Sequence, residues 1–151
     1  MKKNGFTFIE ILVSVTIISI LVAIAVISYG SINKRSRDAR RKSDIEQLRS
    51  ALEMYRADKG YYPNGSSLSF FPIDLVDNSP GRILLDEGYI NALPTDPKDN
   101  TLYPYKYIMT NPRSGHYYGY CLAAYTESEG SGVNACTQTL PTSYTYGVKN
   151  P

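Results

Sequence analysis

Residues 5–29 read GFTFIEILVSVTIISILVAIAVISY, and this stretch decides the fold. Of the 24 residues from Phe6 to Tyr29, 18 are apolar, and the 23 residues from Ile11 to Asn33 carry no charge. A helix needs about 20 apolar residues to span a bilayer, and no proline interrupts this run. The sequence therefore predicts a transmembrane helix over residues 6–30.

The alternative explanation of this segment is a secretory signal peptide, because Lys2 and Lys3 form a short basic leader before the apolar run. The apolar region of a signal peptide is shorter than this one, and residues 29–33 (YGSIN) make a poor cleavage site. We therefore expect the helix to be retained.

Charge is unevenly distributed behind this helix. Residues 34–59 contain nine basic and five acidic side chains, whereas residues 60–151 contain five basic and eight acidic ones. A basic segment can contact nucleic acid, lipid headgroups or the acidic head of a neighbouring copy. The cluster at residues 34–42 contains an aspartate, lacks aromatic residues and follows the span directly, so we expect headgroup contact or pairing between subunits rather than nucleic-acid binding.

Glu10 is the anomaly of the apolar run, because an unpaired carboxylate in lipid costs a few kcal/mol. On composition alone, its side chain would extend to the interface or become protonated. The residues around it suggest another role. Residues 2–10, KKNGFTFIE, resemble the prepilin leader of type IV pilins and type II secretion pseudopilins, in which a basic leader, a glycine and a phenylalanine precede the glutamate.

The resemblance implies that prepilin peptidase cleaves between Gly5 and Phe6 and methylates the new Phe6 amine, which leaves 146 of the 151 residues. Glu10, one helical turn along, would then pair with the Phe6 ammonium of its own or an adjacent subunit and fix the register of a filament. Many pilins carry a proline late in this helix, where the present chain has Ile27, so we expect a continuous helix.

Two signals disagree about orientation. Six basic residues at positions 34–42 follow the span and two precede it, so the positive-inside rule alone would leave the head in the cytoplasm. The leader motif implies the opposite, because its peptidase acts on the cytoplasmic side. Cys121 and Cys136, an even pair beyond the span, also suggest an oxidising compartment and a disulfide, so we expect the head outside the cytoplasm.

The helix is expected to continue beyond the membrane as an amphipathic stalk over residues 31–59. Ile45, Leu48, Leu52 and Tyr55 repeat at intervals of three and four and form one apolar stripe, and Gly60 is a typical residue just after a helix end. A helix from Phe6 to Lys59 has 54 residues and is about 80 Å long. A head of 92 residues cannot bury it, so lipid or other copies must cover its first half.

Residues 60–151 are expected to form a small antiparallel sheet packed on this stripe, which makes the fold class α+β. Turn residues and apolar runs predict a short helix at 82–87, closed by Gly88, and two strands at 103–110 and 116–125 around a turn at 111–115. Tyrosines 103, 105 and 107 alternate and should share one face of the sheet. A third strand is expected at 133–139 or at 144–148.

The head also resembles those of pseudopilins, through GYYP at 60–63, GYI at 88–90 and LPTDP at 93–97. Some major pseudopilins bind calcium in the loop after the second strand, where this chain has Glu127 and Glu129. The aspartate-rich ligand pattern is absent, so we expect solvated loop carboxylates and no metal.

No catalytic motif accompanies these features, and we predict neither an enzyme nor a cofactor. His116, the lone histidine, is expected on the hairpin surface, and Asp96 and Asp99 are expected to be turn residues beside prolines. A membrane-anchored binding module, such as a DNA-uptake or adhesive tip protein, is a further alternative, but the head is small for one.

The favoured function is a structural subunit of a type IV pilus-like filament, and the alternative is a pseudopilin of a type II secretion or competence system. The partners that the resemblance implies are further copies of the chain, prepilin peptidase, an inner-membrane assembly platform and, before assembly, membrane lipid. The expected localisation is a single-pass membrane protein that becomes part of an extracellular or periplasmic filament.

Overall fold

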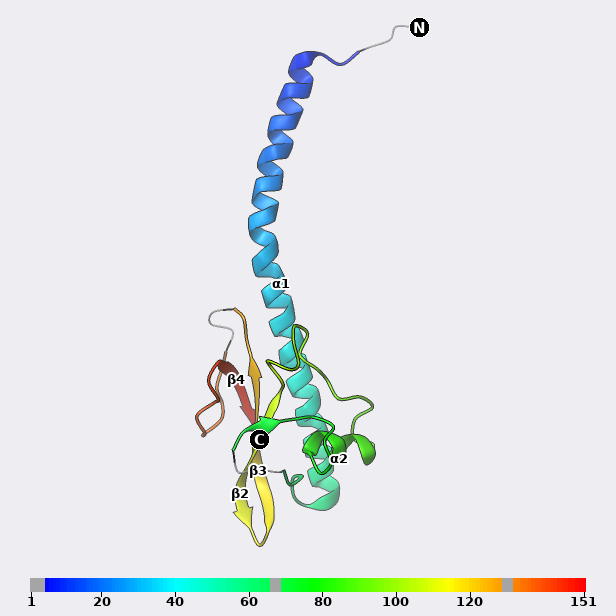
Figure 1. The fold of residues 1–151 in the computed structure, drawn as a ribbon, viewed down its shortest axis with the longest axis vertical. Coiled ribbons are helices and arrows are strands. Elements are labelled where there is room, and N and C mark those ends of the chain that lie inside the picture. Colours follow the sequence, from blue (N-terminus) through cyan, green and yellow to red (C-terminus); the bar gives the residue numbers. More distant parts are fainter. Residues whose placement is uncertain (1–4, 66–68, 129–131) are drawn as a thin grey trace.

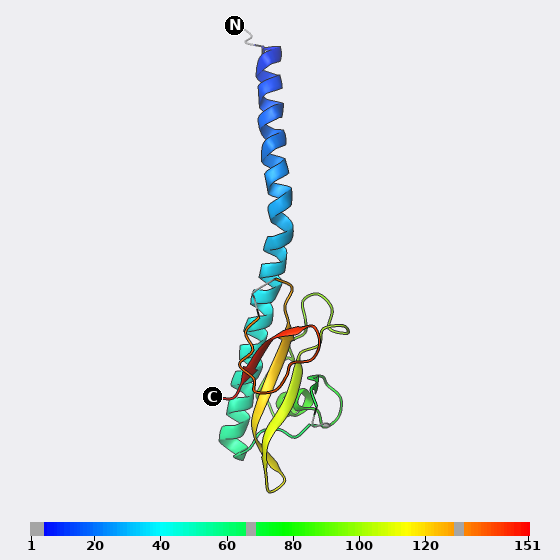
Figure 2. The same ribbon diagram turned by 90° about the vertical axis from the view of Figure 1, so that its left-hand side faces the viewer.

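The computed structural model describes residues 5–65, 69–128 and 132–151. A long helix carries a small antiparallel sheet beside its C-terminal half, and its N-terminal half extends away from the head (Figures 1 and 2). This is the α+β architecture that the sequence predicts. The elements are α1 (Phe8–Lys59), β1 (Phe71–Pro72), α2 (Pro80–Asp86), β2 (Lys106–Arg113), β3 (His116–Tyr125) and β4 (Tyr144–Lys149).

The helix α1 is unbroken over 52 residues, or about 78 Å, so the expected continuous helix is confirmed. It ends as predicted, with Gly60 in the left-handed region at φ 85°. It begins two residues later than predicted, because Thr7 is extended and its hydroxyl accepts a hydrogen bond from the Glu10 backbone. A side chain that caps the first turn in this way fixes where the helix begins.

The four strands lie in the order β1-β2-β3-β4, and all neighbouring pairs are antiparallel. The predicted hairpin exists, but its turn is shorter than the expected five residues. Strand β2 continues to Arg113, which pairs with His116, and Ser114 and Gly115 form the tip with φ of 48° and 82°. Two consecutive residues with positive φ are what a tight two-residue hairpin turn requires.

Of the two candidates for a third strand, residues 144–148 are correct and form β4. Residues 133–139 contribute only an isolated bridge between Asn134 and Gly147. The sequence does not predict strand β1, since two residues are too short for a periodic pattern. The helix α2 begins two residues before the predicted one because Ser79 caps it and Pro80 takes its first position.

The core lies between the apolar stripe of α1 and one face of the sheet. All four stripe residues are buried, as predicted, and they pack with buried side chains of the head that include Tyr62, Leu84, Tyr105, Tyr107, Tyr120 and Leu122. The tyrosine hydroxyls reach polar groups at the rim, since Tyr105 donates to Asp44 at 2.7 Å and Tyr120 to Glu53 at 3.0 Å. Tyr103 precedes β2 and does not join this face; its ring stacks on Tyr125.

Candidate functional site: the assembly helix and its junction with the head

The N-terminal half of α1 has no cover from its own head (Figure 1). The large apolar side chains described between Phe6 and Ile32 are 46–83% exposed. This surface far exceeds the apolar patches of soluble monomers. In the part of the chain that the structure describes, α1 is the one helix long and apolar enough to cross a membrane, which fits a single-pass anchor.

The start of α1 presents the residues that the leader motif singles out. Gly5 and Phe6 are exposed and precede the helix. The Glu10 carboxylate accepts hydrogen bonds from the Thr7 backbone N–H at 2.8 Å and from the Thr7 hydroxyl at 2.7 Å, which completes a reciprocal capping box. Sequence reasoning missed Thr7, although the pattern Thr-x-x-Glu is the usual signal for this cap. The pairing of Glu10 with a Phe6 amine stays a prediction.

The basic cluster at residues 34–42 divides between two environments. Lys34 and Arg35 are exposed, whereas Arg41 is completely buried and Arg37 turns towards the head. The expectation of headgroup or inter-subunit contact is therefore wrong for Arg41, because the helix rotates this side chain into the junction between α1 and the head.

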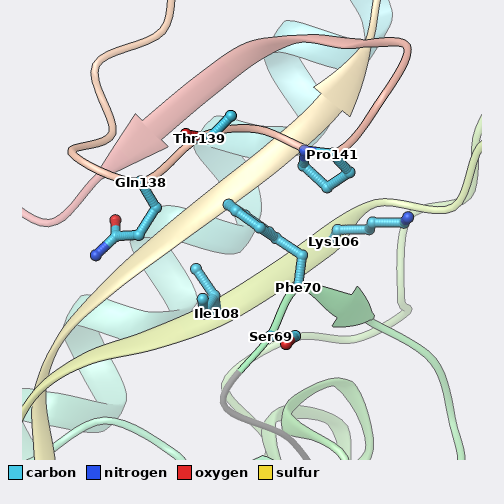
Figure 3. A pocket seen from close by; sticks show the side chains of 7 residues that line it. All are labelled: Ser69, Phe70, Lys106, Ile108, Gln138, Thr139 and Pro141. Atoms are coloured by element: carbon cyan, nitrogen blue, oxygen red, sulfur yellow. The ribbon is translucent and has the colours of Figure 1, made fainter.

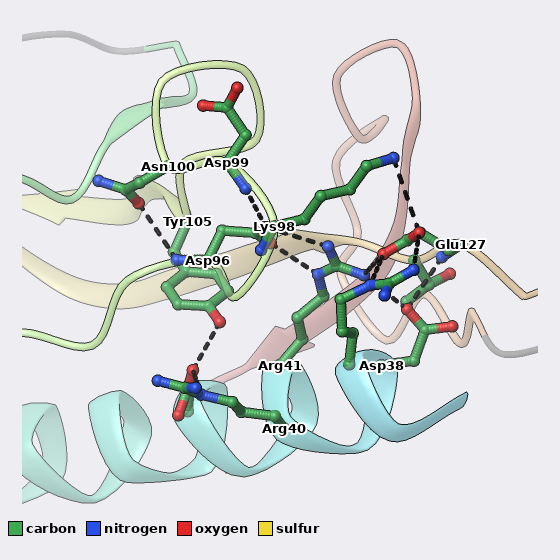
Figure 4. Close-up of polar contacts among 12 residues, drawn as sticks. Asp38, Arg40, Arg41, Asp96, Lys98, Asp99, Asn100, Tyr105 and Glu127 are labelled. Atoms are coloured by element: carbon green, nitrogen blue, oxygen red, sulfur yellow. Dashed lines mark hydrogen bonds and ion pairs between the residues drawn. The ribbon is translucent and has the colours of Figure 1, made fainter. Parts of the chain in front are cut away.

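Arg41 is the centre of a buried ion cluster (Figure 4). Its guanidinium donates to both oxygens of Asp96, at 2.6 and 3.0 Å, to Asp38 at 2.8 Å and to Glu127 at 2.8 Å. The bidentate geometry with Asp96 is the strongest form of the arginine–carboxylate contact. Burial lowers the pKa of Arg41, but its hydrogen bonds with Asp96, Glu127 and Asp38 outweigh this effect and raise it overall.

Glu127 connects the loop after β3 to the same cluster. It accepts two hydrogen bonds of 2.7 Å from Arg37, and Lys98 lies 3.7 Å away. The hydrogen bonds from Arg37 lower the pKa of Glu127 to about 2, more than burial raises it. Its side chain is 5% exposed, so the expectation of a solvated loop carboxylate is wrong for Glu127.

Asp38 fastens the backbone of this loop to α1. Its carboxylate accepts the N–H groups of Glu127 and Ser128, both at 2.9 Å. Burial raises the pKa of Asp38, but these two backbone donors, with Arg41, outweigh it and lower the pKa. The loop that follows β3 is thus held to the helix by both main-chain and side-chain contacts.

The carboxylates at this junction do not fit a calcium site. Their oxygens face guanidinium and backbone N–H donors, and the described residues contain no group of three acidic, histidine or cysteine side chains arranged to hold a metal ion. A cation bound here would have to displace Arg41. Glu129 lies outside the described residues.

Asp96 and Asp99 have the predicted turn roles. Asp96 accepts the N–H groups of Lys98 and Asp99, and Asp99 accepts that of Thr101. The contact of Asp96 with Arg41 was not predicted, because the two residues are 55 positions apart and nothing in the local sequence links them. Burial raises the pKa of Asp96, but Arg41 and the two backbone donors outweigh it and lower the pKa.

A disulfide joins Cys121 and Cys136, the pair that the sequence predicts, with Cα atoms 5.8 Å apart. It fastens the centre of β3 to the segment that leads back to β4. The bond lies on the opposite side of the sheet from α1, because Cys121 alternates with the core residues Tyr120 and Leu122.

Among the described residues, no catalytic arrangement lines the main hollows of the head. The one shown in Figure 3 has a volume of about 390 Å³, and Lys106 is the only ionisable residue among its seven lining residues. The Lys106 ammonium lies 4.6 Å from the centre of the Tyr144 ring. His116 is partly buried at the hairpin and stacks on Tyr61, 4.0 Å between ring centres, so the surface position expected for it is only partly correct.

Known protein families match both the N-terminal part of α1 and the segment that contains the stalk and most of the head. Residues 1–26 match the prokaryotic N-terminal methylation motif. Residues 29–138, which include the stalk and most of the head, match type II secretion system protein G. The chain belongs to the type II secretion system protein G family. Members of this family are structural pseudopilin subunits rather than enzymes.

Curated relatives bear the same description. The chain is 32% identical over 135 residues to type II secretion system core protein G of Pseudomonas aeruginosa. The alignment covers 89% of this chain and 92% of the relative. It is 31% identical over 112 residues to the Escherichia coli protein of that name, with 74% of each chain covered. For the Vibrio cholerae protein the identity is 29% over 134 residues, with 89% of each covered. No solved structure matches.

Proposed function

We propose that this chain is a pseudopilin subunit of a type II secretion system, anchored in the membrane by α1 and polymerised through that helix into a periplasmic filament. One observation carries the proposal: α1 is a continuous helix whose apolar half is uncovered, in a chain that matches protein G along its stalk and head. The relatives are secretion proteins, so the comparisons favour the pseudopilin over a type IV pilus subunit.

The proposed mechanism follows from what can cover α1. Lipid covers the apolar half before assembly, and the same half of other copies covers it in the filament. The head, together with the C-terminal half of α1, then forms the outer layer of the filament. Transfer from lipid to a bundle of identical helices gains little hydrophobic energy, so packing and polar contacts must select the register.

Glu10 is proposed to supply the polar contact. Cleavage between Gly5 and Phe6 by prepilin peptidase creates an ammonium at Phe6, and methylation keeps its charge. An isolated carboxylate and an isolated ammonium in an apolar bundle are each unfavourable by several kcal/mol, and pairing removes most of this cost. The capping box with Thr7 holds the Glu10 carboxylate at the end of the helix, where that amine emerges.

The test uses the full chain in its host, with the chromosomal copy deleted. Mass spectrometry of filaments isolated from the periplasm is expected to find Phe6 as the methylated first residue. Glu10→Gln is expected to insert and be cleaved normally but to yield few filaments by electron microscopy. Filaments that begin at Met1, or normal filament yield from the Glu10→Gln variant, would contradict the proposal.

A further inference from the structure

Two exposed surfaces of the molecule have opposite charge and are each partly apolar. The first, which we call the basic collar, consists of Tyr29, Ile32, Lys34 and Arg35 of α1. Tyr29 and Ile32 are 69% and 60% exposed. Within the described residues, the exposed side chains of Lys34 and Arg35 have no ion pair or hydrogen bond.

The second surface, which we call the acidic edge, lies on the head and consists of Leu75, Val76, Asp77, Asp86 and Glu87. Leu75 and Val76 are 48% and 64% exposed, although both are apolar. The three acidic residues line one hollow of about 440 Å³ together with Arg82, which pairs with Asp86 at 2.8 Å. Asp77 is exposed and, in the part of the chain that the structure describes, its side chain has no cationic partner.

We propose that the basic collar of one subunit binds the acidic edge of a second copy of this chain. The inference rests on the proposed function, since it names a contact between the α1 helix of one subunit and the head of another in the filament. Arg35 and Ile32 lie one helical turn apart and share one side of α1. This side offers a cation to the unpaired carboxylate of Asp77 and an exposed apolar side chain to Leu75 and Val76. Charge complementarity of this kind selects partner and register more than it adds affinity.

The dimensions of α1 agree with such a contact between parallel copies. The acidic edge lies level with the end of α1, because Glu87 pairs with Lys59 at 2.9 Å. The 24 residue-to-residue steps from Arg35 to Lys59 correspond to about 36 Å along the helix axis. The head contacts α1 from Arg37 to Lys59, a length of about 33 Å. A parallel copy displaced by this distance along the axis, and by about 8–10 Å sideways so that the two α1 helices pack side by side, brings its basic collar level with its neighbour's acidic edge.

The experiment reverses charges in the full chain in host cells that lack the native copy. Arg35→Glu alone and Asp77→Lys alone are each expected to lower filament yield at least tenfold, measured by quantitative electron microscopy of filaments isolated from the periplasm. The double variant, which exchanges the two charges, is expected to recover most of the yield. Arg113→Glu, a matched reversal at the exposed hairpin tip, is expected to leave the yield unchanged.

A second measurement places the two surfaces together. Arg35→Cys combined with Asp77→Cys is expected to give ladders of cross-linked subunits with a short bis-maleimide, because the native cysteines are paired and do not react. Arg35→Cys with Arg113→Cys is the matched control and should give none. The melting temperature of each variant should equal that of the original chain. A change in filament yield then reflects the contact between subunits and not misfolding.

The outcomes separate this inference from the proposed function. Filaments of normal yield from both reversals, without cross-links, would overturn the inference and leave the filament intact. Arg35→Glu could instead lower the filament yield without recovery in the double variant and also bind vesicles of anionic lipid more weakly. This result would show that the basic collar binds lipid headgroups, and it would also overturn the inference. Absence of filaments from the unaltered chain would contradict the proposed function itself.

Discussion

Arg41 and Asp96 form a bidentate ion pair with N–O distances of 2.6 and 3.0 Å, and both side chains are completely buried. The pair joins the stalk of α1 to the loop before β2. Glu127 brings the loop after β3 to the same guanidinium. Three cations and three carboxylates meet here, namely Arg37, Arg41, Lys98, Asp38, Asp96 and Glu127, so the junction is electrically balanced.

Removal of Arg41 is expected to destabilise the head strongly. Arg41→Met keeps much of the volume but leaves the carboxylates of Asp38 and Asp96 without their cation, and removal of one partner of a buried pair costs about 3–5 kcal/mol. Chemical unfolding of the full chain in detergent measures the effect. Arg40→Met is the matched control, since Arg40 is 63% exposed and lies 3.9 Å from Asp44. Equal stability of the two variants would show that the cluster does not hold the junction.

Acid is expected to release the loop after β3. The pKa of Glu127 is lowered from 4.5 to about 2 in the folded state. A carboxylate with a depressed folded pKa contributes its full stability above its unfolded pKa and loses it as pH falls through the folded one. Unfolding free energy should therefore fall between about pH 5 and pH 2, and Glu127→Gln should flatten this dependence.

The matched control for the pH experiment is Glu46→Gln. Glu46 is 51% exposed and pairs with Arg49 at 3.3 Å on the surface of α1, where an ion pair contributes at most about 1 kcal/mol. Its variant should keep the acid dependence of the original chain. If Glu127→Gln also keeps that dependence, other carboxylates are responsible for it.

Chelation is expected to leave the head unchanged, because Arg41 and Arg37 supply the cationic charge that the carboxylates of this junction require. The melting temperature of the full chain in detergent should be the same with EDTA and with excess calcium. A melting temperature that falls with EDTA and recovers with calcium would show that a cation binds after all, and Glu127→Gln would then test whether it binds at this loop.

The features of the fold that depend on local pattern were predictable, and those that depend on distant partners were not. The stripe from Ile45 to Tyr55 has helical spacing, and the hairpin has two alternating runs around turn residues. Arg41 is one of six basic residues at positions 34–42 and gives no local sign of burial, since its partners Asp96 and Glu127 lie 55 and 86 residues away. The two-residue strand β1 carries no pattern at all.

The start of α1 is expected to depend on the hydroxyl of Thr7. Thr7→Val keeps the shape but removes the cap and the hydrogen bond to Glu10, and loss of a cap costs about 1 kcal/mol. Thr7→Ser, the matched control, retains both contacts. We expect slower filament assembly from Thr7→Val, measured as filament length against time after induction, and normal assembly from Thr7→Ser. Equal assembly would show that Glu10 finds its partner without help from Thr7.

The disulfide between Cys121 and Cys136 is expected to stabilise the outer side of the sheet. Its cysteines are 15 residues apart, and the chain-entropy model gives about 3 kcal/mol for a loop of this length. That is a large share of the stability of a small domain. Cys121 is completely buried at the centre of β3, whereas Cys136 is only partly buried, so Cys136→Ser removes the bond with little change to the core.

Cys136→Ser is therefore expected to lower the melting temperature of the full chain by several degrees, to about that of the original chain after reduction with dithiothreitol. Reduction should not lower the melting temperature of Cys136→Ser any further, because it has no bond left to break. Ser143→Ala, an exposed substitution just before β4, is the control, because it alters the same segment and leaves the disulfide intact.

If two thiols of native filaments react with an alkylating agent after denaturation without reduction, the bond is absent from the assembled protein. Leader cleavage should be unaffected in both variants, since the N-terminal half of α1 separates Phe6 from the head that carries the disulfide.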